Sequence, residues 1–376
     1  MQFRDLHAQY QALKPQIDEG IARVIESTSF ILGKPVEELE EQLAAYAGRK
    51  HCIGVANGTE ALQLSLMAMD VGPGDAVFTS DFTYFASAGC ASIIGATPVL
   101  VDIDLATFNI SPAALERAIE RTIAEGKLRP RAVIPVDLFG LPADYPAIEK
   151  IARKYGLFIL EDAAQGFGGR IDGKRACSFG EISATSFFPA KPLGCYGDGG
   201  AIFTDDAAMD ARLRSLRASG KSPEDKYDNR EVGMNSRLDT LQAAILLPKL
   251  RAFADYELDA VNAAAARYTA ALRDKLVTPT VPEGYLSSWA QYTVLLDEDT
   301  DRAAVQRRMK EKGIPTMVYY PRGLHQQAAY RSMQLCDAEY PNTVAATRRV
   351  LSLPIHPYLR EDEQDFVIDS LREVLG

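Results

Sequence analysis

Short apolar runs alternate with helix-patterned segments along the first part of the chain, up to about residue 204. The runs predict β-strands at residues 51–56, 77–80, 98–104, 131–137, 157–162 and 201–204. Between them, apolar residues recur at helical spacing, as Leu62, Leu66 and Met69 do. Strands that are apolar on both faces and separated by helices are typical of a mostly parallel sheet covered on both sides. The pattern therefore predicts an α/β fold.

The alternation ends before the last third of the chain. Two predicted helices and two strand-like pieces follow there, at residues 302–312, 362–374, 290–296 and 317–320. We therefore expect two domains. A large domain, which begins with a helical segment, would span residues 1–250, and a smaller α+β domain would span residues 251–376.

The composition excludes several classes of protein. The 376 residues are 47% hydrophobic and 24% charged, as in ordinary globular proteins. A net charge of -10 disfavours nonspecific binding to nucleic acid or to anionic membranes. No apolar run approaches the roughly 20 residues of a membrane span, and residues 1–10 do not resemble a secretion signal. Five scattered cysteines and four histidines without ligand spacing favour a reduced, cytoplasmic protein that lacks a metal site.

Lys191 is the first candidate for chemistry. It lies in a stretch of hydroxyl, aromatic and glycine residues that runs from Ser183 to Thr204. A lysine that is partly removed from water loses its proton more easily and becomes a nucleophile that can form a Schiff base. By itself, the stretch is equally compatible with a Gly-rich loop that carries a salt-bridged lysine.

Other candidate groups lie where predicted strands end. Asn57-Gly58-Thr59 joins a strand to a helix, a geometry that presents free backbone N–H groups to an anion, although an empty helix cap explains it as well. Asp162 ends an apolar strand, and Gln165 follows it. Because ligands of parallel sheets bind beyond the carboxyl ends of the strands, we expect these groups to lie close together.

Lysine, strand-end acid and anion-binding turn are the three requirements of pyridoxal phosphate. Its aldehyde needs a lysine amine, its ring nitrogen needs a carboxylate, and its phosphate needs N–H and hydroxyl donors. An aromatic side chain near the second turn, Tyr84 or Phe82, could stack on the ring. A nicotinamide-binding enzyme lacks support, because no Gly-x-Gly-x-x-Gly follows an early strand.

Five sequence blocks resemble the signatures of the DegT-type nucleotide-sugar aminotransferases. They occur in the family's order along nearly the whole chain: Asn57-Gly-Thr-Glu-Ala-Leu, Glu161-Asp-Ala-Ala-Gln165, Ser186-Phe-Phe-Pro-Ala-Lys-Pro-Leu-Gly, Gly197-Asp-Gly-Gly and Gly233-Met-Asn-Ser-Arg-Leu-Asp-Thr-Leu-Gln-Ala-Ala. The resemblance implies the aspartate-aminotransferase fold (fold type I), pyridoxal phosphate as the cofactor, and a homodimer whose active sites are shared between subunits.

The resemblance also implies roles for individual residues. Lys191 would form the Schiff base and carry the proton, and Asp162 would pair with the ring nitrogen. The remaining cofactor contacts would come from Gln165 against the ring, Tyr84 stacked on it, Gly58, Thr59 and Ser186 at the phosphate, and Asn235 of the partner subunit at the phosphate. Because the family's dehydratase branch has His where Lys191 stands, transamination with L-glutamate, which leaves 2-oxoglutarate, is the expected reaction.

The wording of the blocks is most similar to the branch that aminates UDP-linked 3-keto-N-acetylglucosaminuronate for O-antigen and related surface polysaccharides. The alternatives are a 4-keto-6-deoxy sugar linked to UDP or dTDP and, more distantly, a non-catalytic regulator that binds the cofactor. Where the branch has His-Tyr-Pro, this chain has Tyr319-Tyr320-Pro321. The candidate sugar contacts are Arg237, Tyr319, Tyr320, Arg322 and His325. A solvated loop charge explains Arg322 equally well.

Overall fold

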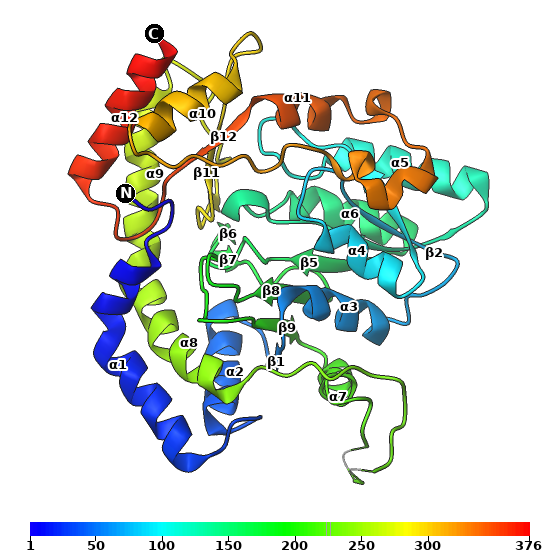
Figure 1. The fold of residues 1–376 in the computed structure, drawn as a ribbon. Coiled ribbons are helices and arrows are strands. Elements are labelled where there is room, and N and C mark those ends of the chain that lie inside the picture. Colours follow the sequence, from blue (N-terminus) through cyan, green and yellow to red (C-terminus); the bar gives the residue numbers. More distant parts are fainter. Residues whose placement is uncertain (223, 226) are drawn as a thin grey trace.

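A seven-stranded sheet lies at the centre of the chain (Figure 1). The computed structural model describes residues 1–222, 224–225 and 227–376. The sheet has the order β1-β9-β8-β5-β4-β2-β3. Its strands are β1 His51–Val55, β2 Asp75–Ser80, β3 Thr97–Val101, β4 Arg129–Ile134, β5 Phe158–Asp162, β8 Ile182–Ser186 and β9 Gly200–Thr204. Within it, β9 alone runs antiparallel to its neighbours, so the predicted mostly parallel sheet is confirmed.

Helices cover both faces of this sheet, because successive strand residues point to opposite sides. In β2, Val77 belongs to a core with three helices, α3 Gly58–Ala68, α4 Ala86–Ile93 and α7 Ala207–Leu216. The next residue, Phe78, belongs to a core with two others, α5 Pro112–Glu125 and α6 Tyr145–Tyr155. A third core joins Phe203 of β9 to α2 Lys34–Ala47 and α8 Thr240–Ala252, against which α1 Leu6–Ser27 packs.

The C-terminal part is built on a two-stranded antiparallel sheet of β11 Tyr292–Leu295 and β12 Val350–Leu353. Its helices are α9 Leu258–Leu272, α10 Arg302–Glu311, α11 Pro341–Arg349 and α12 Glu361–Leu375. Short strands β6 Arg170–Ile171, β7 Lys174–Arg175 and β10 Tyr285–Leu286 form a third sheet. The predicted division at residue 250 falls inside α8, which continues through a π-helical segment, Phe253–Glu257, into α9, and it stays a prediction.

One predicted strand does not form. Residues 317–320 contribute a single bridge, between Met317 and Ser352. The sequence pattern suggested a strand because three of these residues are β-branched or aromatic. The tyrosines at 319 and 320 line a cavity beside the central sheet instead. Within the described ranges, no helix is both long and apolar enough to cross a lipid bilayer.

The shared core between β9, α2 and α8 generates a prediction about stability. Phe203 is fully buried in it, so Phe203→Ala should lower the free energy of unfolding by about 3–5 kcal/mol. Phe366, which is 48% exposed, is the matched control, and its replacement by Ala should change that free energy by about 0.5 kcal/mol or less. Urea denaturation followed by circular dichroism measures both. Equal effects of the two variants would contradict the packing described.

Candidate active site

A cavity of about 520 Å³ opens beyond the carboxyl ends of β1, β5 and β8. Its volume lies within the range of small-molecule sites. The predicted residues that line it are Gly58, Thr59, Tyr84, Asp162, Gln165, Ser186, Lys191, Tyr319 and Tyr320. The structure thus brings together nine side chains or backbone positions that the sequence spreads over more than two thirds of the chain.

Asp162 lies at the end of β5 and is almost completely buried. Its carboxylate accepts hydrogen bonds from the hydroxyl of Ser87 at 2.8 Å and from the backbone N–H of Ala164 at 3.1 Å. Burial raises the pKa of Asp162, while these two bonds and the charge of Lys191 act in the opposite direction. A buried carboxylate with spare acceptor capacity is suited to hold a cationic N–H group of a ligand.

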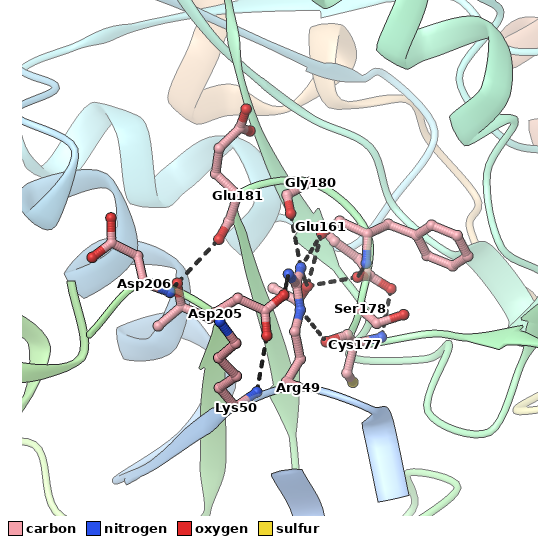
Figure 2. Close-up of polar contacts among 12 residues, drawn as sticks. Arg49, Lys50, Glu161, Cys177, Ser178, Gly180, Glu181, Asp205 and Asp206 are labelled. Atoms are coloured by element: carbon pink, nitrogen blue, oxygen red, sulfur yellow. Dashed lines mark hydrogen bonds and ion pairs between the residues drawn. The ribbon is translucent and has the colours of Figure 1, made fainter. Parts of the chain in front are cut away.

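The other face of β5 carries an equally buried acid, Glu161. It accepts three hydrogen bonds of 2.7–2.8 Å, from the backbone N–H groups of Cys177 and Phe179 and the hydroxyl of Ser183. Figure 2 shows this network. Neighbouring residues of a strand point to opposite faces of the sheet. Asp162 therefore points toward the cavity, and Glu161 anchors β5 on the face away from it.

Arg49 completes the network behind β5 (Figure 2). Its guanidinium donates to the carbonyl oxygens of Phe179 and Gly180 at 2.9 and 2.8 Å and pairs with Asp205 at 2.8 Å. The turn between β7 and β8 is therefore tied to the residues that precede β1 and follow β9. This arrangement fixes the strands whose far ends form the cavity.

Lys191 lies in the loop between β8 and β9, and its backbone N–H donates to Phe188 at 2.8 Å. Burial lowers the pKa of the Lys191 ammonium; Asp162 opposes this effect and Arg4 adds to it. Arg4 approaches from the N-terminal segment and donates to the carbonyl of Pro192 at 3.4 Å. An amine with a lowered pKa beside a carboxylate can act as a nucleophile and exchange a proton at Nζ.

The N-terminus of α3 forms a tight cradle next to Lys191. Asn57 caps the helix by accepting a hydrogen bond from Glu60 at 2.9 Å. A Cβ atom at Gly58 would lie 2.7 Å from the Cβ of Ser186, so a larger residue would close the cradle. Free N–H groups and the positive end of the helix dipole favour an anion at this position, and the Ser186 hydroxyl lines the same cavity.

Gln165 connects two walls of the cavity. Its side-chain carbonyl accepts from the backbone N–H of Phe139 at 2.8 Å, and its amide donates to the hydroxyl of Tyr320 at 3.2 Å. Tyr84 lines the cavity but is 58% exposed, which leaves much of its ring open to a partner. Tyr84 could therefore stack on the face of a planar ligand, and Gln165 could approach its edge.

Four predicted residues do not line this cavity within their own chain: Asn235, Arg237, Arg322 and His325. Asn235 and Arg322 are exposed, and Arg237 is partly exposed. The His325 side chain is only 1% exposed, and both of its ring nitrogens face carboxylates, at 2.6 Å from Asp81 and 2.9 Å from Asp337. Such a ring has no free nitrogen for a sugar, so direct substrate contact by His325 is not what the geometry supports.

The sequence pattern did not predict two residues of the site, Ser87 behind Asp162 and Gln291 in the cavity lining. Ser87, whose hydroxyl bonds Asp162, lies about one helical turn after Tyr84, and that spacing is the only local signal that marks it. Gln291 also lines the cavity, and its side-chain carbonyl is buried without a partner among the described residues. It precedes β11, far along the chain, and no local pattern marks it.

The sequence of the whole chain is similar to known aminotransferases. The model of the DegT/DnrJ/EryC1/StrS aminotransferase family matches residues 11–372. The chain belongs to this family. It is 46% identical over 360 residues to the UDP-2-acetamido-2-deoxy-3-oxo-D-glucuronate aminotransferase of Pseudomonas aeruginosa, which covers 96% of both chains.

Two further similarities extend over the whole chain. The pleiotropic regulatory protein of Geobacillus stearothermophilus is 42% identical over 374 residues, 98% of this chain and 97% of that protein. The crystal structure of a DegT/DnrJ/EryC1/StrS aminotransferase from Brucella abortus superimposes with a TM-score of 0.97 at 46% identity and covers 100% of both chains. The resemblance and the fold type expected from the sequence are confirmed.

Members of this family use pyridoxal phosphate, and the residues of the cavity fit that cofactor. Asp162 would hold the ring nitrogen, Lys191 would bind the aldehyde carbon, and the α3 N-terminus with Ser186 would hold the phosphate. The Gly58 cradle, which a Cβ atom would fill, matches the close approach that a phosphate requires. When bound, pyridoxal phosphate supplies a ring that accepts electrons from the carbon next to the transferred nitrogen.

The enzyme is thus a pyridoxal-phosphate-dependent sugar-nucleotide aminotransferase, and its own residues divide the work. Lys191 would take up and return a proton at Nζ, and the burial that lowers its pKa favours the neutral amine that this step requires. The hydrogen bonds from Ser87 and Ala164 hold the Asp162 carboxylate in an orientation in which it would pair with the ring nitrogen. Tyr84, Tyr319 and Tyr320 form walls of the cavity.

The Ser87–Asp162 hydrogen bond generates a prediction about cofactor affinity. Ser87→Ala should raise the dissociation constant of pyridoxal phosphate about tenfold, because it removes a hydrogen bond to a charged group. Ser92→Ala is the matched control, since Ser92 lies on the same helix and contacts Tyr330 instead. Titration of the two apo-proteins with the cofactor, followed by fluorescence, measures the difference. An unchanged affinity in Ser87→Ala would show that Asp162 does not depend on this bond.

Proposed function

We propose that this enzyme transfers the amino group of L-glutamate to the C3 carbon of UDP-linked 3-keto-N-acetylglucosaminuronate and releases 2-oxoglutarate. The observation that carries the proposal is the combination of a cavity lined by Lys191 and Asp162 with 46% identity to a Pseudomonas aeruginosa enzyme named for that uronate, across 96% of both chains. The retained Lys191 and Asp162 argue against a purely regulatory cofactor-binding role.

Two arginines support a substrate that carries negative charge. Arg322 is exposed and Arg237 is partly exposed, so their guanidinium groups are accessible to a ligand. A guanidinium group matches the geometry of a carboxylate or a diphosphate. We assign Arg237 to the uronate or diphosphate and propose that Tyr319 and Tyr320 contact the sugar, since both line the cavity.

We further propose a homodimer in which each subunit completes the site of the other. Asn235 and Arg237 lie outside the cavity lining of their own chain, as expected if they reach the site of a partner subunit. Four large apolar side chains are exposed in the isolated chain and support an interface, because apolar surface is costly in water: Phe30, Ile31, Leu32 and Phe188. The product would serve surface polysaccharide synthesis, such as O-antigen of lipopolysaccharide, in the cytoplasm.

The substrate is tested by turnover with a panel of 3-keto and 4-keto sugars linked to UDP or dTDP. With L-glutamate as donor, we expect the UDP-linked 3-keto uronate to give the highest kcat/KM and the 3-amino product by mass spectrometry. Lys191→Ala should lower turnover by about 100-fold or more, because it removes both the nucleophile and the proton carrier. A preference for a 4-keto-6-deoxy sugar would replace the proposed substrate, and an active Lys191→Ala variant would refute the role of Lys191.

The role of Arg237 is tested by comparing a charged sugar with a neutral one. Arg237→Gln should raise KM for the uronate about tenfold or more, since a charge-assisted contact is lost. KM for the neutral UDP-linked 3-keto-N-acetylglucosamine should change by about threefold or less. Arg251→Gln, on an exposed helix position that faces Glu38, controls for loss of a surface charge. Equal increases for the two sugars would assign Arg237 to the diphosphate rather than to the uronate carboxylate.

A further inference from the structure

His325 joins two segments that are far apart in the sequence. Its backbone N–H and its ring Nδ1 both lie within hydrogen-bond distance of the carboxylate of Asp81, at 2.8 and 2.6 Å, and its Nε2 lies 2.9 Å from Asp337. The ring also stacks on Tyr340, with centroids 4.5 Å apart. Asp81 is fully buried, whereas the Asp337 side chain is 60% exposed. The imidazole is thus clamped between a buried and an exposed carboxylate.

Both joined segments lead directly into the cavity. Asp81 precedes the turn that carries Tyr84, and this turn leads into α4, where Ser87 bonds Asp162. His325 follows the segment that carries Tyr319 and Tyr320. A backbone hydrogen bond of 2.8 Å from Leu324 to the carbonyl of Asp81 runs beside the ring contact. The clamp therefore connects the wall formed by Tyr84 to the wall formed by the tyrosine pair.

Gly323 shows that the clamp leaves no spare room. A Cβ atom at this position would lie 2.5 Å from the Oδ2 of Asp81 and 2.8 Å from the Nδ1 of His325. Real Cβ atoms do not approach polar atoms so closely, and both neighbours are held by hydrogen bonds. A side chain at residue 323 would therefore push the carboxylate and the ring apart.

We propose that His325 is a positioning residue that fixes the distance between the Tyr84 wall and the Tyr319–Tyr320 wall of the active-site cavity. It acts on the bound sugar through these walls, and not by touching it. This inference rests on the proposed function in one respect, namely that the nucleotide sugar lies between these walls.

The protonation of the ring follows from its partners. Two ionised carboxylates facing the two ring nitrogens require both nitrogens to donate, which only the imidazolium can do. Burial raises the pKa of Asp81, while the hydrogen bonds and the charge of His325 act in the opposite direction. Burial by itself lowers the pKa of His325, but the hydrogen bonds and charges of Asp81 and Asp337 outweigh it, and the pKa is raised. The other charged or titratable groups around the cluster are Asp102 near Asp81, Arg348 near Asp337, and Tyr340 with its neighbours Glu339 and Arg121.

The raised pKa of His325 determines how KM for the sugar should change with pH. A raised pKa in the folded protein means that the clamp is fully formed below the ordinary histidine pKa of about 6.5 and is lost as the pH rises through the raised value. KM for the sugar should therefore increase on the alkaline side. Removing the exposed carboxylate should move that increase to lower pH.

Asp337→Asn is the main test, and Glu339→Gln on the same short helix is its matched control, because Glu339 pairs with Arg121 at 2.6 Å and not with His325. In protein labelled with ¹⁵N-histidine, we expect the His325 ring of the wild type and of Glu339→Gln to carry two protons at pH 7. In Asp337→Asn the midpoint of its titration should fall by about one pH unit. A neutral His325 ring at pH 7 in the wild type, or an equal midpoint in Asp337→Asn and Glu339→Gln, would overturn the proposal.

Kinetics of the two half-reactions separate positioning from general damage. His325→Gln and Gly323→Ala should raise KM for the nucleotide sugar about tenfold, while the reaction of the holoenzyme with glutamate, followed by absorbance, changes about twofold or less. Equal losses in both half-reactions would show that the cluster only stabilises the fold. If the wild type turns over no uronate, the proposed substrate is wrong, and the same kinetics are measured with the panel sugar that does react. The ¹⁵N titration tests the interaction of His325 with Asp81 and Asp337 independently of the substrate.

Discussion

The burial of the Asp162 carboxylate is the constraint on which the active site depends. An ionised carboxylate removed from water costs several kcal/mol unless hydrogen bonds or an opposite charge compensate it. Ser87, Ala164 and the charge of Lys191 compensate only in part, because the pKa of Asp162 remains raised. The same incomplete compensation leaves acceptor capacity on the carboxylate, so a protonated ring nitrogen bound there would offset the cost of burial and would gain affinity from it.

The position of this carboxylate is set from the opposite face of β5. Glu161 binds the turn before β8, and Arg49 ties that turn to the ends of β1 and β9. Glu161 and Arg49 thus fix the orientation of β5, whereas Ser87 stabilises the charge of the Asp162 carboxylate. A sheet that is packed on both faces transmits such constraints because its interior is close to the density of a crystal.

The walls of the cavity depend on contacts between distant segments. Gln165 bridges the backbone of Phe139 and the hydroxyl of Tyr320, and the Asp81–His325–Asp337 cluster bridges the β2 turn and the segment after the tyrosine pair. Cofactor chemistry and sugar binding are therefore served by different parts of the fold. The groups that would hold the cofactor lie at the ends of central strands, whereas the wall that we propose to face the sugar comes from a segment without regular secondary structure.

Local chemistry made much of this readable from the sequence. The alternation of apolar runs with helical spacing determines a parallel sheet, because a strand covered by helices on both faces must consist almost entirely of apolar residues. Lys191, Asp162 and Gly58 stand out from the sequence because the folding of their own strand or turn does not by itself require a lysine, an acid or a glycine there. By contrast, the tertiary structure decided the placement of His325 between two carboxylates, the loss of the strand at 317–320, and the positions of Ser87 and Gln291. Those features depend on which distant carboxylates, carbonyls and tyrosines meet in space, and hydrophobic periodicity carries no information about such pairs.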